Sequence, residues 1–307
     1  MWNCPYSNDS FPTFAEDIGG GASPSADALS AAAKAGGVVL VGGSIPERSG
    51  SRLYNTCCVF DADGALLAKH RCRKSRGGVG RKGLKVTGLG SRSKVGGERE
   101  VVEAECAEMS RVVSQAVAAV RRPFLTFYSP SPPPQPCHPA RKTHLFDIDI
   151  PGGQRFKESD TLTAGSALTV VDTRFGRLGV GICYDLRFPE LAQLCRQRGA
   201  QLLVYPGAFN MTTGPAHWEL LLRARALDNL LFVAACSPAR DESAGYVAWG
   251  HSLAVGPWGN VLVDAGSQEG IAYAELDLGQ IEAQRTAIPI MSQRRSDVYE
   301  LVDKTLE

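Results

Sequence analysis

The sequence contains little that would direct the protein to a membrane or to nucleic acid. No apolar run approaches the ~20 residues that a membrane-spanning helix needs. The 33 Lys and Arg nearly balance the 32 Asp and Glu, so the net charge of +1 supplies no overall field for an anionic partner. We therefore expect neither nucleic acid nor a membrane among its partners.

Cysteine and histidine patterns that would mark disulfides or a metal site are also missing. The nine cysteines are odd in number and include no Cys-x-x-Cys pair. Reduced thiols in a cytosol-like compartment fit this usage better than a disulfide framework, so we expect a cytoplasmic protein. Organelle targeting stays open, because the chain opens abruptly in motif-like sequence. The adjacent Cys137 and His138 chelate poorly, and we expect no metal and no other cofactor.

Positive charge is concentrated in one internal block. Residues 72–141 carry 13 Lys and Arg against 5 Asp and Glu. The block begins with Gly, Arg, Lys and Ser without apolar periodicity, a composition typical of disorder. An amphipathic helix is expected over residues 98–122, followed by a Pro-rich stretch. We therefore divide the chain into residues 1–71, a basic insert at 72–141, and residues 142–307.

The two outer parts show regular element patterns. In the first, residues 1–18 are expected to be loop, followed by a helix at 25–34, a buried strand at 38–41 and a hairpin of 53–60 with 65–70. In the second, strands alternate with helices. The expected strands are 168–172, 178–183, 202–205 and 231–236, the helices are 189–198 and 216–228, and a meander follows at 251–255, 261–263 and 271–276. This alternation predicts an α/β layered fold.

Cys183 is the most informative single residue. An apolar run at 178–182 reads as a buried strand that delivers the thiol to a turn, after which Pro189 opens a helix. A thiol near a helix N-terminus is biased towards thiolate, the reactive form. The alternative is a buried cysteine that acts only as a small hydrophobic residue.

Four motifs around and after Cys183 carry a family resemblance. They are Gly181-Ile-Cys-Tyr-Asp-Leu-Arg-Phe-Pro-Glu190, Leu203-Val-Tyr-Pro-Gly-Ala-Phe-Asn210, Thr212-Thr-Gly-Pro-Ala-His-Trp-Glu-Leu220 and Ser237-Pro-Ala-Arg-Asp241. Together they resemble the nitrilase (carbon-nitrogen hydrolase) superfamily, and the last two resemble its omega-amidase branch. The resemblance implies a four-layer α-β-β-α sandwich and a carbon-nitrogen hydrolase activity.

The resemblance also implies catalytic roles. Cys183 matches the nucleophile. Lys142, in Lys142-Thr-His-Leu-Phe-Asp147, matches the cation that stabilises the oxyanion together with the backbone N–H of Tyr184. Glu158 matches the second glutamate, which positions the lysine and the leaving group. The alternatives are an exposed surface lysine and a solvated loop carboxylate.

The sequence departs from the family at its start. In the family, a loop like Trp2-Asn-Cys-Pro-Tyr6 follows a strand ending in Pro-Glu, whose Glu is the general base. Here Met1 directly precedes that loop, so we expect the first strand, the first helix and the base to be missing. Glu16 and Glu47 lie in other contexts and do not replace the base.

The second departure is the insert itself. Deleting residues 72–141 would join Arg71 to Lys142 and restore a family-like junction. We interpret the block as a translated intron, because its Phe, Leu, Tyr, Ser and Pro residues fit the pyrimidine-rich codons before a splice acceptor. A functional basic insert for docking a partner is the alternative.

Substrate-binding residues are expected on the turn after Cys183 and beyond the next strand. The Arg187 guanidinium would hold a substrate carboxylate, unless it forms a structural ion pair with Asp185 or Glu190. Phe209 and Asn210 are expected to line the pocket, with Tyr184 beside them.

These observations lead to one functional expectation with named alternatives. We expect an omega-amidase-type hydrolase that cleaves alpha-ketoglutaramate or alpha-ketosuccinamate through a cysteine thioester. The alternatives are an amidase of deaminated glutathione, an N-carbamoyl amidase, or a non-catalytic pseudoenzyme that lacks the base. The resemblance further implies a homodimer or higher homo-oligomer, in which the tail at 281–307 crosses onto a second subunit.

Overall fold

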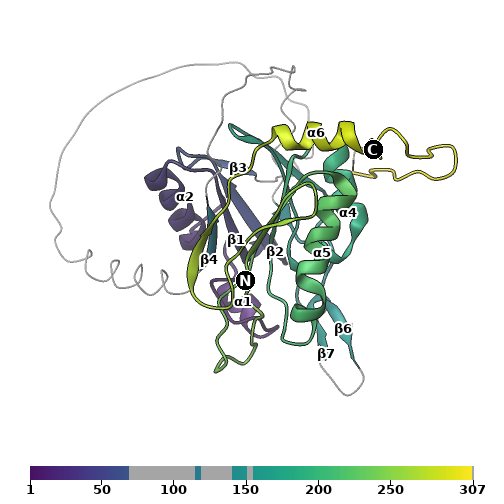
Figure 1. Cartoon of the computed structure of the whole chain (residues 1–307). Coiled ribbons are helices and arrows are strands. Elements are labelled where there is room, and N and C mark those ends of the chain that lie inside the picture. Colours follow the sequence, from purple (N-terminus) through teal and green to yellow (C-terminus); the bar gives the residue numbers. More distant parts are fainter. Residues whose placement is uncertain (69–114, 119–139, 151–154, 306–307) are drawn as a thin grey trace, which may run out of the picture.

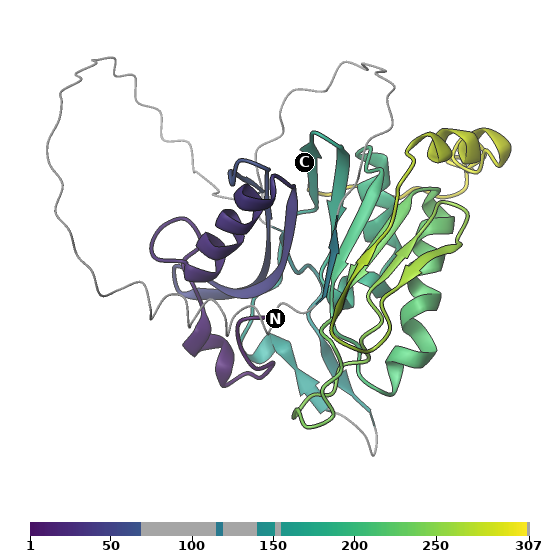
Figure 2. The same cartoon turned by 60° about the vertical axis from the view of Figure 1, so that its left-hand side comes forward.

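The fold is built on two β-sheets with helices on their outer sides (Figures 1 and 2). The structure is a computed structural model that describes residues 1–68, 115–118, 140–150 and 155–305. No helix in these ranges is both long and apolar enough to cross a bilayer.

The first sheet is centred on β2 (Arg52–Phe60). β1 (Leu40–Ser49) pairs antiparallel with β2, and β3 (Leu66–Ala68) and the short β5 (Ala140–Arg141) also pair with it. The side chains of β2 alternate between two apolar clusters. Cys57 and Val59 face the second sheet, whereas Cys58 and Phe60 pack against α2 (Pro24–Gly36). Because both of its faces are buried, β2 forms the centre of the first sheet.

The second sheet has six strands in the order β13-β12-β11-β10-β9-β8. They are β8 (Thr169–Thr173), β9 (Gly176–Val180), β10 (Leu202–Pro206), β11 (Phe232–Cys236), β12 (Leu253–Val255) and β13 (Val261–Asp264). The three central strands β9, β10 and β11 are parallel, because α4 (Pro189–Gln197) and α5 (Thr213–Asn229) form the crossovers between them. This confirms the predicted alternation of strands and helices.

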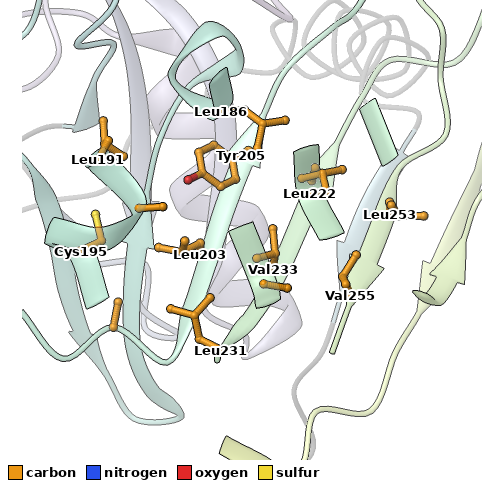
Figure 3. Close-up of a cluster of buried hydrophobic side chains, with 14 of the residues drawn as sticks. Leu186, Leu191, Cys195, Leu203, Tyr205, Leu222, Leu231, Val233, Leu253 and Val255 are labelled. Carbon is orange, nitrogen blue, oxygen red and sulfur yellow. The ribbon is translucent and has the colours of Figure 1, made fainter. Parts of the chain in front are cut away.

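Apolar side chains hold the helices onto the sheets. Leu191 and Cys195 of α4 and Leu222 of α5 pack on Leu203 and Tyr205 of β10 (Figure 3). The resulting order of layers is helix, sheet, sheet, helix, which confirms the predicted four-layer sandwich.

Residues 1–18 were predicted to be a loop, but they contain a short helix. Residues 10–14 form α1 (Ser10–Phe14), because Phe11 is fully buried against Leu53 and Leu162 and this contact fixes the turn. The first strand is also longer than the predicted range 38–41, since β1 continues as far as Ser49.

The predicted meander is only partly right. β12 and β13 pair antiparallel, but β14 (Gly270–Tyr273) pairs in parallel with β4 (Gln115–Ala118). Residues 115–118 are thus strand within the helix predicted over 98–122, and the remainder of that range lies outside the described residues. α6 (Gly279–Ala287) then leads into an extended C-terminal segment (Figure 1).

The ends of the insert meet on one strand. Ala68 lies opposite Val59 and Ala140 lies opposite Cys57, so one β2 residue, Cys58, separates the exit of the chain from its return. Ala140 and Arg141, which were assigned to the insert, therefore belong to the sheet. Because only one residue is needed to bridge these positions, the register marks residues 70–139 as dispensable for the sheet.

We expect deletion of residues 70–139, which joins Lys69 to Ala140, to keep the β2 register and a cooperative thermal transition. Each halving of a closed loop recovers about 0.6 kcal/mol of closure entropy. The deletion also removes β4, the pairing partner of β14, and we expect this loss to offset part of that gain. Differential scanning calorimetry of the two chains measures this. An unfolded or aggregated deletion variant would show that the segment supports the sheet.

Candidate active site

Cys183 sits on a strained turn. It is the first residue of η2 (Cys183–Arg187), a 3₁₀ turn between β9 and α4, and its φ is +49°. A positive φ is uncommon for a non-glycine residue and frequently marks a functional position. The backbone of Gly207 passes close below, where an added Cβ would lie 2.9 Å from the Cys183 Cα. Only glycine at position 207 therefore allows this approach.

The surroundings of the thiol differ in part from the prediction. α4 begins at Pro189, so Cys183 opens a five-residue 3₁₀ turn and does not lie at the N-terminus of the helix itself. Its Sγ contacts the carbonyl oxygen of Ala208 at 3.6 Å, which places the thiol as a donor in this state.

Lys142 and Glu158 form a fully buried ion pair. The distance between Lys142 Nζ and Glu158 Oε2 is 2.6 Å, and both side chains have 0% exposure. Glu158 opens η1 (Glu158–Asp160), directly after the hairpin of β6 (Asp147–Asp149) and β7 (Arg155–Lys157). The alternatives of a surface lysine and a solvated carboxylate are thus wrong. Substitution of either residue would leave the other charge buried and unpaired, which would lower the free energy of unfolding by about 3–5 kcal/mol.

Two further residues of the site were not named from sequence. The Tyr6 hydroxyl lies 2.9 Å from Glu158 Oε1 and 3.4 Å from Lys142 Nζ, and the Asn55 amide donates to the same Glu158 oxygen at 3.3 Å. Burial raises the pKa of Tyr6 well above its usual value, with the Glu158 charge adding to the effect, so its hydroxyl stays a donor. Tyr6 ends the family-like loop Trp2-Asn-Cys-Pro-Tyr6, which was the available signal for that residue.

Asp185 connects the Lys142 segment to the turn that carries Cys183. Its carboxylate accepts hydrogen bonds from backbone N–H groups of both segments. Among the described residues, the partners of Asp185 are thus N–H groups, and the alternative of an ion pair with Arg187 is not formed.

The Arg187 guanidinium lies over the Phe209 ring at 4.7 Å, and its Nη1 is 3.2 Å from His217 Nδ1. Within the described residues, no carboxylate pairs with Arg187, so the alternative of an ion pair with Glu190 is not formed there. The cation is thus free to meet an anionic group in the cavity.

Phe209 and Asn210 line the cavity as predicted, but they differ in role. Phe209 is buried, with its ring against Trp218. The Asn210 Oδ1 accepts hydrogen bonds from Thr212 and Thr213 at the start of α5, so this oxygen has a structural function.

The cavity has a volume of about 1230 Å³ and reaches Cys183, Tyr184 and Arg187. It continues between the two sheets along apolar side chains that include Val41 and Leu202. Among the residues that the structure describes, no group of three His, Cys, Asp or Glu side chains could hold a metal ion. Cys137 and His138 lie outside them.

No second carboxylate meets Lys142 within the described ranges. Glu16 bonds to Ser23 and Ser25, and Glu47 forms two hydrogen bonds with Arg141, at 2.8 and 2.9 Å. Both carboxylates are thus occupied elsewhere, as the sequence led us to expect.

Cys183 should be the most reactive of the described thiols. Burial raises the pKa of Cys195 to about 12 and that of Cys57 well above its usual value, whereas Cys183 opens onto the cavity. At mildly alkaline pH we expect iodoacetamide to label Cys183 at least about 100-fold faster than Cys195. Peptide mass spectrometry over a time course measures both rates, and equal rates would contradict this site.

Comparisons with known proteins agree with the geometry. The sequence model described as "Carbon-nitrogen hydrolase" matches residues 1–95 and 138–286. The Arabidopsis thaliana protein "Omega-amidase, chloroplastic" is 48% identical over 305 residues, covering 99% of this chain and 64% of that protein. This chain therefore spans less than two thirds of that relative. The Bos taurus protein "Omega-amidase NIT2" is 44% identical over 303 residues, covering 99% of this chain and 83% of that protein.

The fold has solved counterparts. The crystal structure of Saccharomyces cerevisiae Nit3, described as a member of branch 10 of the nitrilase superfamily, matches with a TM-score of 0.66 and 36% identity, covering 95% of this chain and 79% of that one. A Xanthomonas campestris protein of the same superfamily, XC1258, shares the fold at a TM-score of 0.63 and 19% identity, covering 97% and 82% of the two chains. With a family match over most of its length, the chain belongs to the carbon-nitrogen hydrolase family.

Proposed function

We propose that the protein is an omega-amidase-type amidohydrolase that cleaves the terminal amide of alpha-ketoglutaramate or alpha-ketosuccinamate. The observation that carries the proposal is the buried Lys142–Glu158 pair, whose two members both contact the Tyr6 hydroxyl. Tyr6 lines the same cavity as Cys183, and so connects the pair to the thiol. Relatives named omega-amidase at 44 and 48% identity support the choice of substrate class.

The chemistry follows from the groups at the cavity. The Cys183 sulfur attacks the amide carbon and forms a C–S bond. The carbonyl oxygen becomes an oxyanion, which the Lys142 ammonium and the backbone N–H of Tyr184 stabilise. The C–N bond then breaks, the nitrogen takes up the proton that the Cys183 thiol gave up on attack, and ammonia leaves. Water hydrolyses the thioester, which gives the dicarboxylate and restores the thiol.

Glu158 holds the Lys142 ammonium in place for this step. Its two oxygens accept hydrogen bonds from Lys142, the Tyr6 hydroxyl, the Asn55 amide and the Phe146 backbone N–H. Because so many donors stabilise the ionised form, Glu158 acts as an anchor for the lysine.

A non-catalytic scaffold is the second candidate function, and one observation favours it. Attack by Cys183 requires a group that takes the thiol proton, and within the described ranges Glu158 is the only carboxylate bonded to Lys142. Hydrolysis of amides would then be slow, because among the described residues no second carboxylate lies beside Lys142 to accept that proton.

A carboxylate supplied from solution can separate these candidates. We expect ammonia release from alpha-ketoglutaramate to be slow and to rise severalfold with added formate, which enters the cavity and accepts the thiol proton. Cys183→Ala should stay at background with and without formate. If no ammonia is released with or without formate, the result supports the non-catalytic scaffold. If ammonia is released rapidly without formate, a base is already in place.

The Arg187 cation supports a substrate with a carboxylate at the end remote from the amide. Its guanidinium is held in the cavity by the Phe209 ring and His217. A charge-assisted hydrogen bond contributes about 1.5–3 kcal/mol. Deaminated glutathione and N-carbamoyl compounds are the runner-up substrates, and a substrate screen separates them.

We expect Arg187→Gln to raise the KM for alpha-ketoglutaramate about 10- to 100-fold, because it removes the cation that meets the carboxylate. The KM for an uncharged amide of equal length should change little. Arg223→Gln, on the exposed side of α5, is the matched control. Equal changes for both substrates would contradict a carboxylate anchor.

Three further proposals concern the protein as a whole. We infer a homodimer or higher homo-oligomer from the family resemblance. In the structure the segment after α6 loops out and returns to its own subunit, where Asp303 pairs with Arg198 (Figure 1). We infer a cytoplasmic location, with a plastid or another organelle as the alternative, because one relative is named chloroplastic. We also infer that residues 72–141 are a translated intron, and sequencing the mature transcript across codons 72–141 tests this.

A further inference from the structure

Asp185 is a buried carboxylate for which the proposed mechanism assigns no step. It lies at the third position of the Cys183–Arg187 turn and is 1% exposed. Its Oδ2 accepts the Ile182 N–H at 2.9 Å and its Oδ1 accepts the His144 N–H at 2.8 Å. One side chain therefore holds two segments that are about 40 residues apart in the chain.

Among the described residues, every hydrogen-bond partner of the Asp185 carboxylate is a donor. The Thr143 N–H adds a third backbone contact at 3.3 Å, and His144 Nδ1 lies 2.8 Å from Oδ1. Since a carboxylate can only accept, His144 carries its proton on Nδ1 in this arrangement. Stacking of the His144 ring on Phe188, at 3.6 Å between centroids, fixes the ring in place.

The donors are the immediate neighbours of the reacting groups. Ile182 precedes Cys183, and Thr143 follows Lys142. A shift of this carboxylate would therefore move the nucleophile and the ammonium relative to each other. Cys183 also has a φ of +49°, and such strain persists only where surrounding contacts enforce it.

We propose that Asp185 is a positioning residue that sets the placement of the Lys142 ammonium against the Cys183 sulfur. This inference rests on the proposed cysteine chemistry, but not on the identity of the amide. It acts through four N–H donors and touches neither substrate nor leaving group.

Two substitutions separate geometry from charge. Asp185→Asn removes the charge and turns an N–H₂ towards N–H donors, whereas Asp185→Glu keeps the charge but displaces it by one methylene. We expect kcat to fall about 100-fold in both, the loss associated with a misplacement of about 1 Å, with KM changed less than about threefold. The partly buried Asp303, paired with Arg198, gives Asp303→Asn as a matched control with unchanged kcat.

The alkylation rate of Cys183 against pH provides a readout that needs no substrate. In Asp185→Glu the midpoint of the profile should move to higher pH, because Lys142 no longer lies in place to favour the thiolate. A lower midpoint in Asp185→Asn with unchanged kcat would show that Asp185 acts only as a charge. A lower melting temperature with an unchanged kcat and profile would show a purely structural role. Either result overturns the proposal.

A variant with milder consequences covers the case in which neither substitution folds. His144→Ala removes the ring donor but keeps the three backbone donors, and we expect a severalfold loss of kcat with KM retained. An unchanged kcat in that case overturns the proposal. If the unsubstituted chain releases no ammonia even with formate, the proposed amidase function fails, while the alkylation profiles still decide the role of Asp185.

Discussion

The site depends on a lysine ammonium buried without access to water. Burial of the Lys142 charge is tolerable only because Glu158 meets it at 2.6 Å and because the remaining carboxylate lone pairs are used by other donors. These partners come from widely separated segments, including Tyr6 near the start of the chain and Asn55 on β2. The ion pair thus requires the parts of the chain before and after the insert to be assembled together.

Cys183, the proposed nucleophile, comes from the other sheet. β9 ends at Val180, and the turn that follows is anchored by Leu186, which is fully buried in the cluster under α4 and α5 (Figure 3). Gly207, which directly follows β10, lies close to the backbone of Cys183, whose φ is positive. Core packing and catalytic geometry are therefore parts of one arrangement.

Local motifs predicted what lies within one segment. The strand, turn and helix around Cys183 and the family-like contexts of Lys142 and Glu158 were sufficient to name the candidate site. Contacts between distant segments were not readable, so Tyr6, Asn55 and Asp185 went unassigned. The same reason explains α1, which depends on burial of Phe11 against β2, and β5, whose two residues are placed by pairing with β2.

All later steps of the proposed reaction depend on attack of the Cys183 sulfur on the amide carbon with Lys142 beside it. Acid quenching during turnover of alpha-ketoglutaramate in formate, followed by peptide mass spectrometry, tests this attack most directly. We expect an acyl adduct on the Cys183 peptide that disappears in Lys142→Ala. Ammonia release that continues without any adduct, and that persists in Cys183→Ala, would contradict it.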